Sequence, residues 1–290
     1  MYLMQDYDDA LEKILKHGIR KTNRTGVDTI SLFGMQSRYR IDERFPLLTR
    51  RKIRHKSMVG ELLWFLSGST LNQDLKDLGC GFWTPWLDKE FEEENGFVDG
   101  AFGPLYGFQL RHFGGHYGNG SSEVNANPLY GEGGFDQLAY MVDLLKNNPN
   151  DRRILFSLWN PKMMHQMRLP PCHYTFQCYT HDGKLSGMLT QRSCDFPVGV
   201  PFNIAFYSAL IYMLAQQADL EPYEFIHTTA DSHIYVNQIE AVEEYLSRGK
   251  PDSPVLKIFA TANSIEDYKP SDFVLEDYNP EPEIKFEVAV

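Results

Sequence analysis

The chain has 290 residues, of which 42% are hydrophobic and 13% aromatic, enough to bury a substantial core in one large domain or two small ones. Its net charge of -11 disfavours broad attraction to nucleic acid or to anionic membranes, so an anionic substrate would have to be captured by local arginines. No apolar stretch of 18 residues occurs, and the acidic amphipathic N-terminus lacks the basic region of a secretion signal. We therefore expect a soluble, unexported protein.

The cysteines are few and widely spaced, and none forms a C-x-x-C pair. Neither a zinc site nor a disulfide framework is indicated, and we expect no metal. A reducing, cytoplasmic setting suits the four of them: Cys80, Cys172, Cys178 and Cys194.

The first third of the chain alternates helical and strand patterns. Apolar residues recur at helical spacing over 6–17, and Gly18 is a typical stop. A polar turn at 21–26 precedes the alternating, aromatic-rich segment 29–39, which is typical of a strand. Helices are predicted over 57–67 and 70–78.

The helix over 57–67 is mostly apolar and carries a single carboxylate, Glu61. Burial of an ionised acid among leucines and aromatics is costly unless the acid is paired or its pKa is raised. Glu61 could also simply mark the polar edge of a core helix. Just before it, residues 50–56 form a basic cluster, which in most proteins is a solvated face.

The middle of the chain contains two indoles, Trp83 and Trp86, which by themselves more often indicate a core or an interface than a ligand site. Residues 111–134 are rich in Gly, Asn and Ser and lack periodicity, so we predict a surface loop there. An amphipathic helix over 135–146 and an apolar strand over 154–159 follow.

The second half supplies the remaining elements. Strands over 176–179 and 184–190 flank a hairpin turn at His181–Gly183. A turn at 197–201 leads to a long buried helix over 202–218, and a strand over 224–237 and a helix over 238–248 come next. No repeat or domain boundary emerges, so we predict one α+β domain, residues 1–290, with a large mixed sheet flanked by helices.

The stretch 167–203 concentrates reactive groups. Cys172 lies between Pro171 and His173, on backbone whose dihedrals the prolines restrict. Downstream, a strand-like run ends in Gln191–Arg192–Ser193–Cys194–Asp195. A thiol, a guanidinium, a hydroxyl and a carboxylate are thereby brought together in a short piece of chain.

Three ordered blocks in this stretch resemble the folate-dependent thymidylate synthase family. The blocks are Leu169-Pro-Pro-Cys172-His173, Gln191-Arg-Ser-Cys-Asp195 and Gly199-Val-Pro-Phe-Asn203. The resemblance runs from Asn23-Arg24-Thr25-Gly26 to the last residue. It implies a methyltransferase that converts dUMP to dTMP with 5,10-methylenetetrahydrofolate as carbon donor and reductant.

The resemblance also assigns the catalytic groups. Cys172 would attack carbon 6 of uracil, and Arg192 would favour its thiolate. Glu61 would handle protons and hold water, and Asn203 would bind N3 and O4 of the pyrimidine, although an Asn here could also be a simple N-cap. The full predicted catalytic set is Cys172, Glu61, Tyr106, Asn203 and Asp195.

For dUMP, bidentate pairing explains a preference for arginine as the phosphate ligand. The resemblance implies a homodimer that packs through the free face of the sheet, in which two arginines reach the partner's site. The predicted phosphate ligands are Arg24, Arg192, Ser193 and, from the partner, Arg152 and Arg153. His233 and Tyr235, two apart on one strand face, would bind the sugar, although such a pair is otherwise most often structural.

The folate is expected to lie against an aromatic wall and under the C-terminal segment. The predicted contacts are Arg51, Phe82, Trp83, Asp195, Val198, Gly199, Phe202, Ala289 and Val290, with Lys52 as a further candidate for the folate tail. Four positions depart from the family pattern. Thr190 replaces a common tyrosine, Phe196-Pro197-Val198 replaces a typical bulky-aromatic-Leu sequence, Ala230 replaces a glycine, and Gln238 replaces a histidine.

Two other functions fit the same residues. A dUMP 5-hydroxymethylase of the same superfamily would use water in place of hydride, but Trp83 and Trp86 favour a dry site. An inactive nucleotide-binding or RNA-binding homologue would need the arginines but not Cys172 or Glu61, and the acidic charge disfavours RNA.

Overall fold

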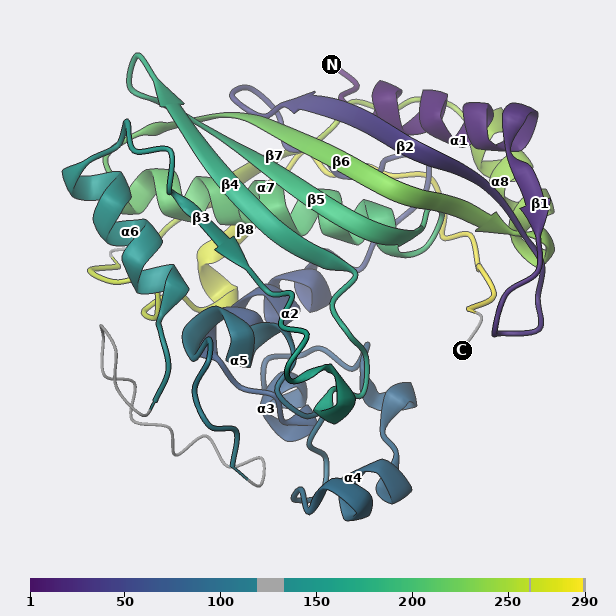
Figure 1. The fold of residues 1–290 in the computed structure, drawn as a ribbon. Helices are drawn as coiled ribbons and strands as arrows, with labels where there is room; N and C mark the ends of the chain where they lie inside the picture. The colour runs from purple at the N-terminus through teal and green to yellow at the C-terminus, as the bar shows by residue number, and fades with distance from the viewer. Residues whose placement is uncertain (119–132, 261, 289–290) are drawn as a thin grey trace.

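A computed structural model describes residues 1–118, 133–260 and 262–288. Its centre is a six-stranded sheet in the order β1-β2-β6-β5-β4-β3 (Figure 1). The strands are β1 Ile19–Lys21, β2 Thr29–Arg40, β3 Leu155–Ser157, β4 His173–His181, β5 Lys184–Asp195 and β6 Glu221–Tyr235. β5 and β6 pair parallel and the other neighbours pair antiparallel, which confirms the predicted mixed sheet.

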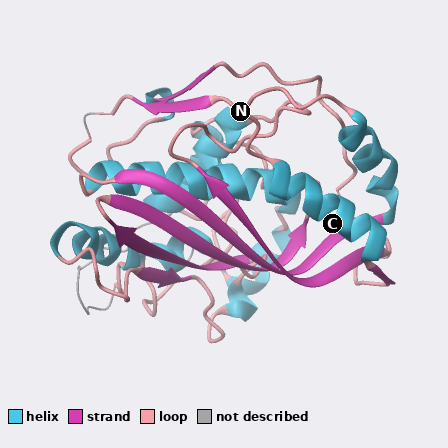
Figure 2. Cartoon of the chain, turned by 90° about the horizontal axis from the view of Figure 1, so that it is seen from above, coloured by secondary structure: helices cyan, strands magenta, loops and turns pink. Residues whose placement is uncertain are grey.

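Helix α7 (Gly199–Gln217) connects β5 to β6 and lies along one face of the sheet (Figure 2). A parallel pair needs such a crossover. Most of α7 is buried on all sides because it packs against β5, β6 and α2 (His55–Ser67). That position accounts for a sequence that is apolar nearly all the way around rather than along one stripe.

The other helices surround this central layer. α1 (Gln5–His17) packs on β2 and also contacts α8 (Ile239–Ser247), and α5 (Tyr106–Arg111) packs on α2. The remaining helices and turns are α3 Asn72–Asp77, α4 Lys89–Asn95, α6 Gln137–Asn147, η1 Thr84–Trp86, η2 Met164–Gln166, η3 Val236–Gln238 and η4 Pro270–Asp272. A two-stranded sheet pairs β7 (Val255–Ile258) with β8 (Phe273–Glu276).

The β4–β5 hairpin turns where the sequence predicts it. Asp182 and Gly183 both have positive φ, 47° and 75°, as a two-residue turn of type I′ requires. Asp and Gly tolerate this conformation better than other residues.

Besides shifts of a few residues at the ends of several elements, three predictions differ from the structure. The turn predicted over 197–201 gives way to α7 at Gly199, because Pro201 falls in the first helical turn, where a missing N–H costs nothing. Asn203 is therefore an interior residue of α7 and not its N-cap, which is Val198. In the predicted loop 111–134, Arg111 ends α5 and Phe113 pairs with Phe135, while residues 119–132 lie outside the described part.

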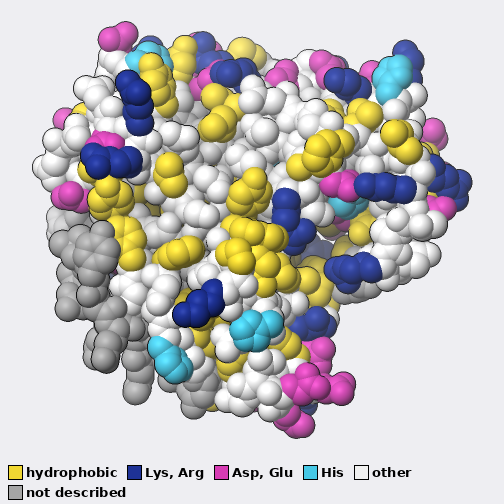
Figure 3. Space-filling model, in the orientation of Figure 1, with side chains coloured by type: hydrophobic (Ala, Val, Ile, Leu, Met, Phe, Trp, Pro, Cys, Tyr) yellow, Lys and Arg dark blue, Asp and Glu magenta, His cyan; other side chains and the backbone are white. Residues whose placement is uncertain are grey.

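The sheet face opposite α7 is left open by the chain's own described elements (Figures 1 and 2). Hydrophobic and basic side chains are interspersed on this side of the molecule (Figure 3). Tyr179 of β4 is 68% exposed, and Leu155 of β3 is 37% exposed. Within the described residues, no helix combines the length and apolar character needed to cross a membrane.

Candidate active site

Cys172 lies just before β4, and hydrogen bonds to Tyr106 and Arg192 fix its backbone. Its backbone N–H donates to the Tyr106 hydroxyl at 2.8 Å, and its carbonyl accepts from the Arg192 N–H at 2.8 Å. The Arg192 guanidinium donates to the carbonyls of Pro170 and Pro171, both at 2.8 Å, and its Nη2 lies 3.9 Å from the Cys172 Sγ. The two prolines therefore position the cation beside the half-buried sulfur.

Two opposing effects act on this thiol. Burial raises the pKa of Cys172 above its ordinary value, because it disfavours the charged thiolate. Arg192 opposes the shift most strongly, followed by the hydrogen bond to Tyr106 and by the charge of Arg24. Arg192 thus acts in the direction that the sequence analysis expects, but burial outweighs it.

Glu61, on α2, is held by the indole of Trp83, whose Nε1–H donates to the carboxylate at 2.6 Å. Burial raises the pKa of Glu61 to about 7, and this hydrogen bond opposes the rise. Trp83 is itself packed against Trp64, Phe102 and Tyr106. A carboxyl with a pKa near neutrality can both accept and release a proton at physiological pH.

Asn203 is oriented by a chain of hydrogen bonds that reaches across three elements. Nε2 of His227 on β6 contacts Oε1 of Gln191 on β5 at 2.8 Å, and Gln191 Nε2 donates to Asn203 Oδ1 on α7 at 3.1 Å. Burial lowers the pKa of His227 to about 3, so the ring is neutral and can donate from Nε2. With its oxygen accepting from Gln191, Asn203 has Nδ2 to offer to a carbonyl oxygen.

Several of these supporting residues had no role in the sequence analysis. His227 and Gln191 form the chain just described, and His173 contacts the Tyr207 hydroxyl through Nδ1 at 2.7 Å. His173 is buried, with its pKa lowered to about 3, and its ring packs on Tyr106. The only sequence signal for His227 is a histidine on the apolar face of a predicted strand, which is too common to indicate a site.

The ends of β5 and β6 bring further predicted residues together. Asp195 pairs in register with His233, and Ser193 with Asp231. His233 Nδ1 lies 3.2 Å from Asp231, and its ring packs edge-on against Tyr235. Burial is the main cause that raises the pKa of Asp195, to about 6, and His233 opposes it.

Arg24 lies in the β1–β2 turn, and its side chain is exposed. Burial raises the pKa of both Cys172 and Tyr235, and the charge of Arg24 opposes the rise at each, so the turn is close to both ends of the site.

The residues predicted to contact folate gather around the start of α7. Phe82 packs edge-on against Phe202. Val198 donates its N–H to Asp195 at 3.4 Å, and Gly199 is the first residue of α7. The predicted contacts Ala289 and Val290 lie outside the described residues.

Arg51 is a buried cation near the same turn. Its Nη2 donates to the Pro197 carbonyl at 2.6 Å, and its guanidinium lies over the Phe286 ring. Its Nε has no hydrogen-bond partner among the residues that the structure describes. Burial lowers the pKa of Arg51. An under-satisfied buried guanidinium beside aromatic rings suits a flat ligand that carries hydrogen-bond acceptors.

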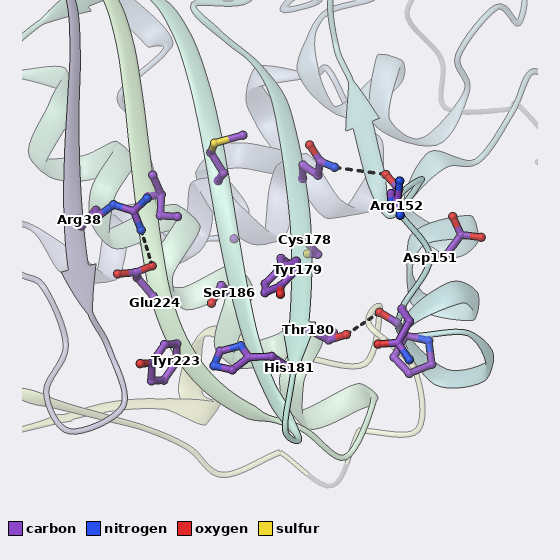
Figure 4. A pocket seen from close by; sticks show the side chains of 16 residues that line it. Arg38, Asp151, Arg152, Cys178, Tyr179, Thr180, His181, Ser186, Tyr223 and Glu224 are labelled. Carbon is purple, nitrogen blue, oxygen red and sulfur yellow. Dashed lines mark hydrogen bonds and ion pairs between the residues drawn. The ribbon is translucent and has the colours of Figure 1, made fainter.

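Arg152 and Arg153 lie elsewhere, before β3, and both are exposed. Arg153 pairs with Asp151. Arg152 borders a cavity of about 530 Å³ on the open sheet face, with Arg38 on the opposite side of it (Figure 4). Arg152 is the sole predicted site residue in its lining, so this cavity is distinct from the surroundings of Cys172.

In the described part of the chain, no cluster of three or more His, Cys, Asp or Glu side chains could hold a metal ion. The groups that the structure does place in the site are a thiol, two carboxyls with raised pKa values and a set of arginines.

Comparison with known proteins adds independent information. Residues 5–290 match the family model described as Thymidylate synthase. The chain is 48% identical over 287 residues to the thymidylate synthase of Human herpesvirus 8 type P (isolate GK18), covering 98% of this chain and 83% of the relative. It is 44% identical over 287 residues to that of Homo sapiens, covering 98% and 90%, and 44% identical over 293 residues to that of Herpesvirus ateles, covering 100% and 99%. A match along nearly the whole chain, together with a cysteine fixed beside a partly buried arginine, shows that this chain belongs to the thymidylate synthase family.

Proposed function

We propose that the chain catalyses the reductive methylation of dUMP to dTMP, with 5,10-methylenetetrahydrofolate as co-substrate and dihydrofolate as the second product. The observation that carries this proposal is the contact between Cys172 Sγ and Arg192 Nη2 at 3.9 Å, within a site that also contains a carboxyl of pKa about 7. A nucleotide phosphate that binds Arg24, Arg192 and Ser193 would lie beside this sulfur. Bidentate guanidinium contacts suit a phosphate dianion.

Cys172 acts as the nucleophile at carbon 6 of the uracil ring. Carbon 5 is a poor nucleophile until this addition breaks the conjugation of the ring and gives an enolate. The Asn203 amide, held by Gln191, donates to the oxygen that gains charge and thereby stabilises the enolate. The His227–Gln191–Asn203 chain is fixed in advance, so little reorganisation is needed during the reaction.

Glu61 handles the protons. Because its pKa is about 7, both protonation states are populated near neutral pH, and the Trp83 indole holds the carboxyl in place. Tyr106 is oriented by the Cys172 N–H at the same end of the ring site. Together these groups account for the proton transfers to O4 and from carbon 5 that the reaction needs.

The folate, when bound, supplies the one-carbon unit and the hydride. The residues present fit it: Phe82, Trp83 and Phe202 form aromatic walls, and Arg51 has an unused buried donor. Asp195, Val198 and Gly199 border the same region at the start of α7. The aromatic walls exclude water, which favours hydride transfer over the hydroxymethylase reaction.

We further infer a homodimer formed through the open sheet face. Arg152 and Arg153 belong to that face and its edge, whereas Cys172 and Arg192 lie at the end of the strands. A two-fold pairing of these faces would bring the arginines of one chain to the site of the other. The four free cysteines also support a reducing, cytoplasmic location.

One assay tests the reaction. Incubation with dUMP and methylenetetrahydrofolate should give dihydrofolate, followed by its absorbance, and dTMP in equal amounts. Hydroxymethyl-dUMP without dihydrofolate would establish the hydroxymethylase instead, and no product would indicate a binding protein. Cys172→Ala should abolish turnover and still bind dUMP.

The dimer is tested by mixing two inactive variants. Cys172→Ala lacks the nucleophile, and Arg152→Glu lacks the donated arginine. In a mixed dimer one site has both an intact cysteine and an intact arginine, so random pairing should restore about a quarter of wild-type activity. No recovery after subunit exchange would rule out the shared site.

A further inference from the structure

Gln238 has a fully buried side chain at the junction of η3 and α8. Its Oε1 accepts the backbone N–H of Tyr235 at 3.1 Å. Its Nε2 donates to the backbone carbonyl of Glu287 at 2.8 Å and to Asp195 Oδ2 at 3.3 Å. A primary amide has one acceptor oxygen and two N–H donors, so these three contacts use all of its hydrogen-bonding groups.

The three partners come from distant parts of the chain. Tyr235 ends β6, and Asp195 ends β5 and also accepts from the N–H of Val198. Glu287 belongs to the terminal segment 281–288, which forms no helix or strand. One amide therefore ties this terminal segment to the two central strands.

The terminal segment has other attachments, but among the described residues none of these is a hydrogen bond to Asp195. Asn237 Nδ2 donates to the side chain of Glu287 at 2.7 Å. The Phe286 ring lies under the Arg51 guanidinium. Asn237 and Gln238 therefore both bind Glu287, Asn237 through the exposed carboxylate and Gln238 through the backbone carbonyl. Replacement of Asn237 is thus a matched control for replacement of Gln238.

Gln238 also affects the carboxyl itself. Burial raises the pKa of Asp195 to about 6, and the effects that oppose this are, in order, the charge of His233, the hydrogen bonds from Gln238 and the Val198 N–H, and the charge of Arg51. The titratable and charged side chains that interact electrostatically with Asp195 from β5, β6 and the segment before α2 are Cys194, His233, Tyr235 and Arg51. Loss of the Gln238 donor should therefore favour the protonated carboxyl.

A histidine at this position could not make the same set of contacts. A neutral imidazole has one N–H and one acceptor, so after accepting from Tyr235 it would have one donor for two acceptors. A protonated imidazole has two donors but no acceptor for the Tyr235 N–H. The glutamine satisfies all three partners without a charge at any pH.

We propose that Gln238 is a positioning residue that holds the terminal segment on Asp195 and Tyr235, and so couples the folate side of the site to the nucleotide side. This inference rests on the proposed function, which assigns Asp195 and the terminal segment to the folate.

Steady-state kinetics of Gln238→Ala tests the coupling. A net hydrogen bond of ordinary strength corresponds to a change of about threefold to tenfold, so KM for methylenetetrahydrofolate should rise by about that factor. The Kd for dUMP alone should stay within about twofold, because the amide contacts the backbone of Tyr235 and not the side chain that is predicted to bind the sugar. The acidic limb of the pH profile of kcat/KM should move to higher pH. Asn237→Ala should leave that profile unchanged.

Gln238→Glu separates positioning from packing, because the two side chains have the same shape. The carboxylate cannot donate to Asp195 or to the Glu287 carbonyl, so KM should rise further than in Gln238→Ala. As the pH falls and the new carboxyl gains a proton, KM should recover only in part, because a protonated carboxyl has one donor for these two acceptors. Thermal unfolding and dUMP binding verify that both variants fold.

The outcomes distinguish the two levels of inference. If the wild-type chain makes no dTMP from dUMP, the proposed function is wrong whatever Gln238 does. If the wild-type chain makes dTMP, but Gln238→Ala and Gln238→Glu match Asn237→Ala in KM and in pH profile, then only the role of Gln238 is refuted.

Discussion

Two carboxyls lie among aromatic side chains in this protein, and they differ in the number of hydrogen-bond donors and cations around them. Asp8 on α1 is fully buried and accepts from the hydroxyls of Tyr2 and Tyr245 at 2.8 and 2.9 Å. It also pairs with Arg50 at 3.1 Å. Glu61 on α2 has the Trp83 indole as its hydrogen-bond donor and no cation beside it among the described residues.

The consequence appears in the pKa values. Burial raises both, but at Asp8 two hydroxyls, Arg50 and Lys250 oppose the rise, whereas at Glu61 only the Trp83 hydrogen bond does. A buried carboxylate that several hydrogen-bond donors and a cation surround stabilises the folded chain. A buried carboxyl with a single donor has a pKa near neutrality and is available for proton transfer. The comparison therefore separates a structural acid from a functional one by counting the partners of each.

Replacement of Glu61 should have the largest effect on activity. Glu61→Gln keeps the shape but removes the titratable group, so kcat should fall by about 10²- to 10⁴-fold. Stability should not fall, because a neutral amide needs less solvation than a carboxylate. Steady-state assays and urea unfolding measure the two quantities, and Glu93→Gln on exposed α4 is the control. A fall of less than tenfold would remove Glu61 from the proton-transfer role.

Replacement of Asp8 should show the opposite pattern. Asp8→Ala leaves the Arg50 guanidinium buried without its partner, which costs about 3–5 kcal/mol of unfolding free energy. Below the melting range kcat should change little. Asp9→Ala, on the exposed side of the same helix, should stay within about 0.5 kcal/mol of wild type by urea unfolding. Equal losses in both variants would contradict a special role for the buried acid.

The pH dependence of stability should also distinguish the acids. The pKa of Glu61 is about 7 in the folded chain against an ordinary 4.5, so folding takes up a proton here. This contribution is fully present below pH 4.5 and is lost as the pH rises to about 7, with a total of about 3 kcal/mol. Glu61→Gln should lack this pH dependence. The free energy of unfolding of the variant, measured in urea, should therefore increase relative to that of the wild type as the pH rises from 5 to 8. A constant difference across this range would show that the carboxyl is not shifted.

The smallest expected effect is that of Trp83→Phe. This variant keeps an aromatic ring but removes the indole N–H, so the hydrogen bond to Glu61 is lost. The free energy of unfolding should fall by about 1 kcal/mol. The pKa of Glu61 should rise further, so the basic limb of the kcat profile should move to higher pH. Trp86→Phe, which leaves the Glu61 contact intact, should not move it.

The sequence predicted some parts of this site well and others not at all. Glu61 stands out as a lone acid in an apolar helix, and the structure gives it a raised pKa. Asp8 does not stand out, because it lies in an acidic amphipathic segment beside exposed carboxylates. Its burial depends on Arg50 and Tyr245, which come from distant segments.

Local patterns by themselves determined most of the central elements: the hairpin at Asp182–Gly183, the long apolar helix and the alternating strands. The predicted hairpin also implies that Cys172 and Arg192 lie close together, because they are at the adjoining ends of its two strands. Short elements such as β1, α4 and α5 were not predicted, because segments of three to seven residues carry too little periodicity.

Only the tertiary structure decided which buried polar groups form hydrogen bonds with one another. The His227–Gln191–Asn203 chain needs β5 and β6 to pair in parallel and α7 to cross over them. Gln238 meets Glu287 because the terminal segment folds back 49 residues later. Hydrophobic periodicity specifies which face of an element is buried, whereas a buried hydrogen bond depends on the register between elements, which no single segment contains.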